Sequence, residues 1–248
     1  MENNMDLIKT IGIIVISSCF VINYSMAVQG DKTDSCDIDS LDQCAKRLFG
    51  YGDPNYTFAT TEEQVLQQCK TSKEAEVCIR QYNNRCVKPF ARQYINIMLR
   101  GPLKSLKERC ASKKGVEEYL KNSDCLTATK KDLDVCTHDV IENFMLVPKT
   151  KKPEWIPLSC CYLSKLEQCS KSAIENKCPP NQTEYTHKAM RNLRGDILDL
   201  FCDHELEWGT SKCDEFASHL PTREIKGKKP ESVLPVILNL MNKYIAKQ

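Results

Sequence analysis

The chain has 248 residues, with 35 Lys and Arg against 33 Asp and Glu, so its formal net charge at pH 7 is only +2. A nearly neutral surface gives no reason to expect nucleic acid or an anionic membrane as a partner. Apolar residues make up 41% of the chain and only two are Trp. We therefore expect a modest core that depends on covalent cross-links.

Residues 1–27 have the features of a signal peptide. Lys9 precedes an apolar run over residues 11–22, and Ser25-Met26-Ala27 supplies small residues at the two positions that define cleavage. The acidic Glu2 and Asp6 are unusual in such a leader. The run is too short to cross about 30 Å of hydrocarbon. We predict cleavage after Ala27, secretion, an extracellular location and no stable membrane insertion.

Fourteen cysteines follow the leader, while Cys19 is removed with it. Twelve of them form two similar ladders, in which matching cysteines are offset by 89 to 92 positions. The first ladder is Cys36, Cys44, Cys69, Cys78, Cys86 and Cys110, and the second is Cys125, Cys136, Cys160, Cys169, Cys178 and Cys202. A repeat of this kind predicts duplicated structural units. We expect two tandem, similar modules packed together, at 28–121 and 122–222, followed by a segment at 223–248.

Helical periodicity dominates the first module. Segments 61–69 and 74–85 favour helix, and apolar residues recur every three or four positions from Val87 to Met98. This stripe predicts a helix over 87–100. Gly101-Pro102 should end that helix, because proline lacks the amide donor and clashes with the preceding turn. A second helix is then expected, with Pro102 in its first turn.

The remaining elements are also expected to be helical. We predict helices over 113–120, 130–144 and 164–173, a loop over 147–157, and a helix from about Asn181, its cap, through the stripe from Tyr185 to Phe201. Gly195 echoes Gly101, which indicates a shared bend or close packing point. A basic tether over 223–230 then leads to an amphipathic helix from Val233 to Tyr244 with Ser232 as its cap. The fold class is all-α.

Cysteines at this density in an oxidising compartment pair, so we predict seven disulfides. Cys161 and Cys213 have no equivalents in the first ladder and are expected to bond to each other. Six cysteines allow fifteen connectivities, and the sequence does not choose among them. The spacing that zinc ligands need is missing apart from the adjacent Cys160-Cys161. We expect no metal and no cofactor.

Candidate sites outside the cysteines are few. Two sequons predict glycosylation at Asn55 and Asn181. The basic residues Lys149, Lys151 and Lys152 form a possible contact surface. No nucleophile elbow, phosphate-binding glycine loop or zinc-protease motif is present. Adjacent residues of a helix do not share a face, so we interpret Asp203-His204-Glu205 as a polar helix end. We expect no catalytic residue and no enzyme activity.

The run from Cys69 through Cys78-Ile79-Arg80-Gln81-Tyr82 to Cys86, with Cys110 and Cys125 beyond it, resembles a known module. It is similar to the cysteine-rich helical module of secreted invertebrate proteins such as the insect 27 kDa haemolymph glycoprotein family. Length, leader and duplicated framework also resemble the centipede scoloptoxin family eleven of venom proteins. Neither resemblance implies particular functional residues.

Two functions follow as hypotheses. The first is a secreted, non-enzymatic, toxin-like venom component that binds a channel, receptor or protease, because dense disulfides give durability outside the cell. The second is a haemolymph glycoprotein that carries a small hydrophobic ligand between apolar helix faces, centred on the stripes of Tyr94 and Leu193. A structural glycoprotein without a specific ligand is the third alternative.

Overall fold

The computed structural model describes residues 36–194, 202–222, 225 and 227–246. The predicted signal peptide, Cys19 and the Gly195 echo therefore lie outside the described residues, as does the end of the stripe at Phe201. The described part contains nine α-helices, three 3-10 turns and no strand, which confirms the all-α prediction. The helices are α2 (Ile38–Phe49), α3 (Glu62–Cys86), α4 (Pro89–Cys110), α5 (Lys113–Lys121), α6 (Ser123–Leu146), α7 (Trp155–Lys177), α8 (Pro180–Arg194), α10 (Ser211–Ser218) and α11 (Val233–Ala246).

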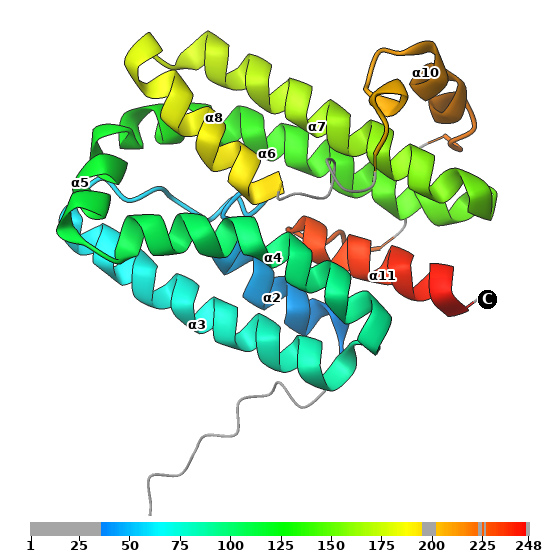
Figure 1. Ribbon diagram of the computed structural model, residues 1–248, viewed down its shortest axis with the longest axis horizontal. Coiled ribbons are helices and arrows are strands. Elements are labelled where there is room, and N and C mark those ends of the chain that lie inside the picture. The colour runs from blue at the N-terminus through cyan, green and yellow to red at the C-terminus, as the bar shows by residue number, and fades with distance from the viewer. Residues whose placement is uncertain (1–35, 195–201, 223–224, 226, 247–248) are drawn as a thin grey trace, which may run out of the picture. The chain divides into compact units, whose positions relative to one another are not determined.

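Residues from Cys36 onward form one compact unit. Helices α2, α3 and α4 pack together, and α6 and α7 form an antiparallel pair against which α8 lies (Figure 1). The two groups meet where α4 packs against α8, and α11 contacts both α2 and α6. Helices of the two predicted modules are thus in direct contact. The division of the chain into two similar modules, with a border near residues 121 and 122, stays a prediction.

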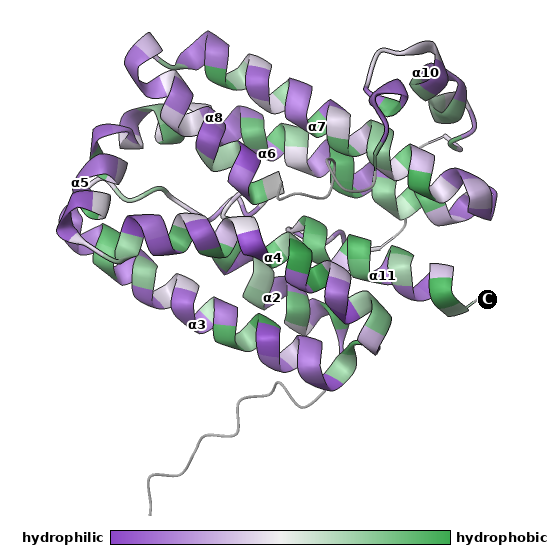
Figure 2. Ribbon diagram, viewed as in Figure 1, coloured by the Kyte–Doolittle hydropathy of each residue, from purple (hydrophilic) through white to green (hydrophobic). Residues whose placement is uncertain are grey.

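Two main apolar cores share the last helix. The first is built from α2, α3, α4 and α11, with Leu41, Ile95 and Leu238 among its buried side chains. The second is built from α6, α7 and α11 and includes Trp155 and Val236. Figure 2 shows that hydrophobic residues are frequent along α11, in agreement with its buried side chains on both sides. Helix α11 therefore joins the two cores.

All fourteen predicted cysteines form disulfides. The bridges of the first ladder are Cys36–Cys86, Cys44–Cys78 and Cys69–Cys110, those of the second are Cys125–Cys178, Cys136–Cys169 and Cys160–Cys202, and the last is Cys161–Cys213. The predicted bond between Cys161 and Cys213 is confirmed. Both ladders pair first with fifth, second with fourth, and third with sixth cysteine. This shared order is what a duplicated framework would give.

The predicted break at Gly101-Pro102 is wrong, because α4 runs continuously from Pro89 to Cys110. Packing holds the helix together on both sides of the proline: Met98 and Leu99 before it and Leu106 after it are buried. Gly101 instead permits a close approach of α8. A Cβ atom at this position would lie 1.8 Å from the Asn192 carbonyl oxygen. Gly101 is thus a close packing point, whereas the feature that it was predicted to share with Gly195 stays a prediction.

The predicted loop over 147–157 is also wrong. Two 3-10 turns, Val147–Lys149 and Lys152–Glu154, fill most of it, and α7 already begins at Trp155. Burial of the indole drives this arrangement: Trp155 is 2% exposed and its Nε1 donates to the Thr150 carbonyl at 3.2 Å. The large side chain fixes the connection between α6 and α7.

The two predicted caps, Asn181 and Ser232, have different outcomes. Helix α8 begins at Pro180, and the Pro179 carbonyl accepts from the Gln182 and Thr183 amides, so Asn181 lies inside the first turn. At the start of α11 the Ser232 hydroxyl donates to Asp42 Oδ1 at 2.7 Å. The same carboxylate accepts from the Glu231 and Ser232 amides at 2.8 and 3.0 Å. The predicted Asn181 cap is therefore wrong, whereas Ser232 lies directly before α11, at the predicted cap position, and is bound there by Asp42.

The segment before α11 is anchored to both groups of helices. Lys228 lies 3.1 Å from Asp39 of α2, and Lys229 lies 2.6 Å from Glu142 of α6. Residues 223, 224 and 226 of the predicted tether lie outside the described residues. In the described part of the chain we find no helix whose length and hydropathy would suit a membrane span.

Candidate ligand-binding site

Tyr51 is a buried residue that lies between two glycines with positive φ. Gly50 ends α2 in the left-handed region at φ 76°, where its amide donates to the Lys46 carbonyl. Gly52, at φ 93°, passes so close to Glu231 that a Cβ atom would lie 2.3 Å from that carbonyl oxygen. A residue with a Cβ atom would be disfavoured at both positions. The pair of glycines thus turns the chain sharply on each side of the tyrosine.

Ion pairs and hydrogen bonds hold this turn against neighbouring helices. The Gly52 amide donates to Asp134 of α6 at 2.8 Å, and Lys130 pairs with the same carboxylate while donating to the Asp53 carbonyl at 2.9 Å. Lys46 of α2 binds Glu231 at 2.6 Å. This hydrogen bond to Glu231 is the main reason that the pKa of Lys46 is raised. Tyr51 therefore lies in a turn that hydrogen bonds and ion pairs hold against the neighbouring helices.

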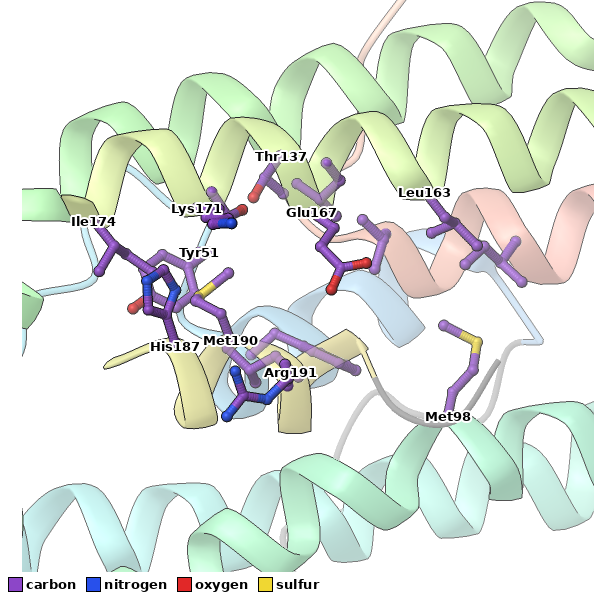
Figure 3. Close-up of a pocket in the computed structure, with 16 residues that line it drawn as sticks. Tyr51, Met98, Thr137, Leu163, Glu167, Lys171, Ile174, His187, Met190 and Arg191 are labelled. Carbon is purple, nitrogen blue, oxygen red and sulfur yellow. The ribbon is translucent and has the colours of Figure 1, made fainter. Parts of the chain in front are cut away.

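A cavity of about 320 Å³ opens beside Tyr51 (Figure 3). Apolar side chains from five helices make most of its wall: Phe49, Met98, Leu163, Leu166, Ile174, Met190, Leu193, Val233 and Ile237. Figure 3 shows Glu167 extending from α7, and Met98 from α4, into the space between these helices. The volume is at the lower end of the range for small-molecule pockets. A mostly apolar wall favours an apolar occupant.

Two buried hydroxyl groups in this wall have no hydrogen-bond partner among the described residues. They belong to Tyr51, which is 5% exposed, and Ser170, which is 3% exposed. Leaving a buried polar group unpaired costs about 1–3 kcal/mol. Burial also raises the pKa of Tyr51 well above its usual value, so the hydroxyl stays protonated and can donate. Both groups are available to a polar atom of a bound molecule.

Charged side chains surround the cavity rather than fill it. Lys171, Glu167, His187 and Arg191 contribute to its wall. Lys171 lies 3.9 Å from Glu175, and His187 lies at the same distance from that carboxylate. A small number of polar groups in an apolar wall is the usual composition of a binding pocket for an organic ligand.

The residues singled out from sequence lie away from this cavity, apart from Met98 and Leu193 of the two predicted apolar stripes. Asn55 and Asn181 are exposed, and their glycosylation stays a prediction. Lys149 and Lys151 are exposed near the start of α7, whereas Lys152 lies over the Tyr244 ring at 4.7 Å. Asp203 caps a 3-10 turn at His204–Leu206 rather than a helix end. These groups do not converge on one site.

Sequence reasoning missed Tyr51 and Ser170. The one available signal was the Gly50-Tyr51-Gly52 triplet, since two glycines around an aromatic residue indicate a special backbone at that point. Of the two stripes proposed for a carrier, Leu193 lines the cavity. Of the stripe of Tyr94, Val87 and Met98 are buried in the first core and Met98 also lines the cavity, whereas Phe90 is 53% exposed.

Within the described ranges, no group of three or more His, Cys, Asp or Glu side chains is placed to hold a metal ion. Comparison with known proteins finds no family model, curated protein or solved structure that matches the chain. The function must therefore be inferred from the site itself.

Proposed function

We propose that this protein is a secreted, non-catalytic binding protein that holds a small hydrophobic ligand in the cavity beside Tyr51. The observation that carries the proposal is the combination of an apolar wall with two unpaired hydroxyls at Tyr51 and Ser170. A ligand with an apolar body and polar atoms that reach these hydroxyls would suit this lining. Seven disulfides support the extracellular part of the proposal, because such bonds persist outside the cell.

Native and denaturing mass spectrometry of the secreted protein test this directly. We expect an extra mass in the native spectrum that disappears on denaturation. The emptied protein should then bind the neutral fluorescent probe N-phenyl-1-naphthylamine with one-to-one stoichiometry. A bare chain in the native spectrum, together with no probe binding, would overturn the proposal.

A cavity-filling variant localises the binding. Leu166 is a partly buried residue of the cavity wall, so Leu166→Trp should weaken probe binding at least about tenfold, the effect of one lost 1.4 kcal/mol contact. Leu66 lies on α3 and is 53% exposed. The matched variant Leu66→Trp adds the same bulk at the surface and should bind as the wild type does. Equal binding by both variants would place the probe elsewhere.

A toxin-like surface binder is the second candidate. It is favoured by the exposed Lys149 and Lys151 on a connection that the Trp155–Thr150 hydrogen bond holds in one conformation. A preorganised basic surface loses little entropy when it binds an acidic partner. Currents of voltage-clamped neurons should change when the protein is applied and change less with Lys149→Gln/Lys151→Gln. The variant Lys113→Gln/Lys114→Gln, which alters an exposed pair on α5, is its control.

A further inference from the structure

A second cavity, of about 880 Å³, lies beside the first. Helices α4, α5 and α8 and the segment after α2 surround it, and Phe49, Tyr51 and Leu193 line both cavities. The two spaces therefore adjoin at these three residues. A molecule longer than the first cavity could extend past these side chains into the second.

Arg109, in the last turn of α4, contributes to the wall of the second cavity. Its guanidinium carbon lies 5.1 Å from the centre of the Tyr119 ring. The guanidinium also lies close enough to the Tyr56 hydroxyl to lower its pKa, against the larger effect of burial. Its Nε is buried and has no hydrogen-bond partner among the described residues. Arginine stays charged at every physiological pH, so a partly buried cation with an unused donor lies in this wall.

Tyrosine hydroxyls surround the guanidinium without neutralising it. Burial raises the pKa of Tyr56, Tyr119 and Tyr185, and that of Tyr185 reaches about 12. All three therefore keep their protons at physiological pH. The Tyr119 hydroxyl accepts from the Ala59 amide at 3.2 Å, which leaves its own proton free to be donated. The tyrosines near Arg109 therefore present neutral hydroxyls and aromatic rings to it, without a negative charge.

The nearby carboxylates are engaged with lysines. Glu108 lies 3.0 Å from Lys188, and Glu118 lies 3.8 Å from Lys121. We find no carboxylate within ion-pair distance of Arg109 in the part of the chain that the structure describes. Partly desolvating a cation without a counter-charge is costly, and a guanidinium matches a carboxylate with two parallel hydrogen bonds. The unmatched charge is the feature that a ligand could neutralise.

We propose that the ligand is a carboxylic acid with an apolar chain, whose carboxylate pairs with Arg109 while its chain runs along Phe49, Tyr51 and Leu193 toward the first cavity. This inference rests on the proposed function and adds the ligand's chemical class to it. The phenolic hydroxyls near Arg109 would donate to the same carboxylate. The apolar chain would contact the wall described above.

The test compares dodecanoate with dodecanol, two probes that share a chain length and differ in charge, by calorimetry on the delipidated full-length secreted protein. We expect dodecanoate to bind at least about tenfold more tightly, the effect of one charge-assisted hydrogen bond. This comparison needs no variant. Arg109→Gln should then bring dodecanoate to the affinity of dodecanol and leave dodecanol unchanged, with near-ultraviolet circular dichroism reporting that the variant is folded.

Arg191→Gln tests which cavity holds the carboxylate, since Arg191 is an exposed cation in the wall of the first cavity. It should leave the preference for dodecanoate intact. If the preference disappears in Arg191→Gln and survives in Arg109→Gln, the carboxylate lies in the first cavity and the inference is wrong. If wild type binds both probes equally, the inference fails while the proposed function stands. If it binds neither, both fail.

Discussion

Asp42 ties the start of the last helix to the first helix of the described chain. Its carboxylate is 2% exposed and accepts from two amides and the Ser232 hydroxyl. We expect Asp42→Ala to lower the free energy of unfolding by about 2–4 kcal/mol, because three donors lose their acceptor in a buried place. Urea denaturation followed by circular dichroism measures the change.

Asp39→Ala is the control for that prediction. Asp39 lies one turn away on α2, is 54% exposed and pairs with Lys228 at 3.1 Å. Exposed ion pairs contribute about 0–1 kcal/mol. An equal loss in the two variants would show that the buried hydrogen bonds add nothing beyond a surface charge pair.

Ionisation of Tyr185 should depend on folding. Burial raises its pKa to about 12, whereas tyrosine in an unfolded chain has a pKa near 10. The folded chain thus keeps a proton that the unfolded chain has lost. This contribution to stability is complete below a pH of about 10 and disappears as the pH rises toward the folded-state pKa. Rapid pH jumps followed by tyrosinate absorbance should show a late-ionising component that Tyr185→Phe removes. If the titration of this variant matches wild type, the assignment is wrong.

At the scale of elements, the α4–α8 contact depends on one missing side chain. Gly101→Ala would place a methyl group 1.8 Å from the Asn192 carbonyl oxygen. We expect a loss of about 1–3 kcal/mol from overpacking, although alanine is favoured over glycine in a helix by about 1 kcal/mol. Thermal unfolding measures the net effect. The neighbouring exposed variant Arg100→Ala should change stability by less than about 0.5 kcal/mol. A stabilised Gly101→Ala would contradict the close approach.

The elements also show where sequence reasoning ends. Periodicity and cysteine spacing predicted the helical class, the α5 segment and the pair Cys161–Cys213. Local rules failed where distant contacts outweighed them: Pro102 remains in α4 because buried neighbours hold the helix on both sides. Tyr51 and Ser170 belong to a site that exists only after five or more segments have packed. A linear pattern contains no information on that convergence.

At the scale of the whole molecule, α11 should make the described unit unfold as one. Leu238 lies in the first core, whereas both tryptophans, Trp155 and Trp208, lie in or against the second. Leu238→Ala should cost about 2–5 kcal/mol. We expect the midpoints from tryptophan fluorescence and from far-ultraviolet circular dichroism to fall together. Val135→Ala, at a 62% exposed position, should leave both unchanged. A fluorescence midpoint that stays at its wild-type value would show that the two cores unfold separately.

The disulfide order has a consequence for synthesis. Every bridge of the first ladder closes by Cys110, and every other bridge begins at or after Cys125. Fourteen cysteines could pair in on the order of 10⁵ ways, whereas six have 15 and eight have 105. The amino-terminal part of the chain leaves the ribosome first. Its six cysteines can therefore pair before the eight later cysteines have been synthesised. The order of the cysteines along the chain thus divides the formation of seven disulfides into two smaller sets of pairings. Among the described residues, the peptide between Cys110 and Cys125 is the only covalent link between the two disulfide-bonded parts.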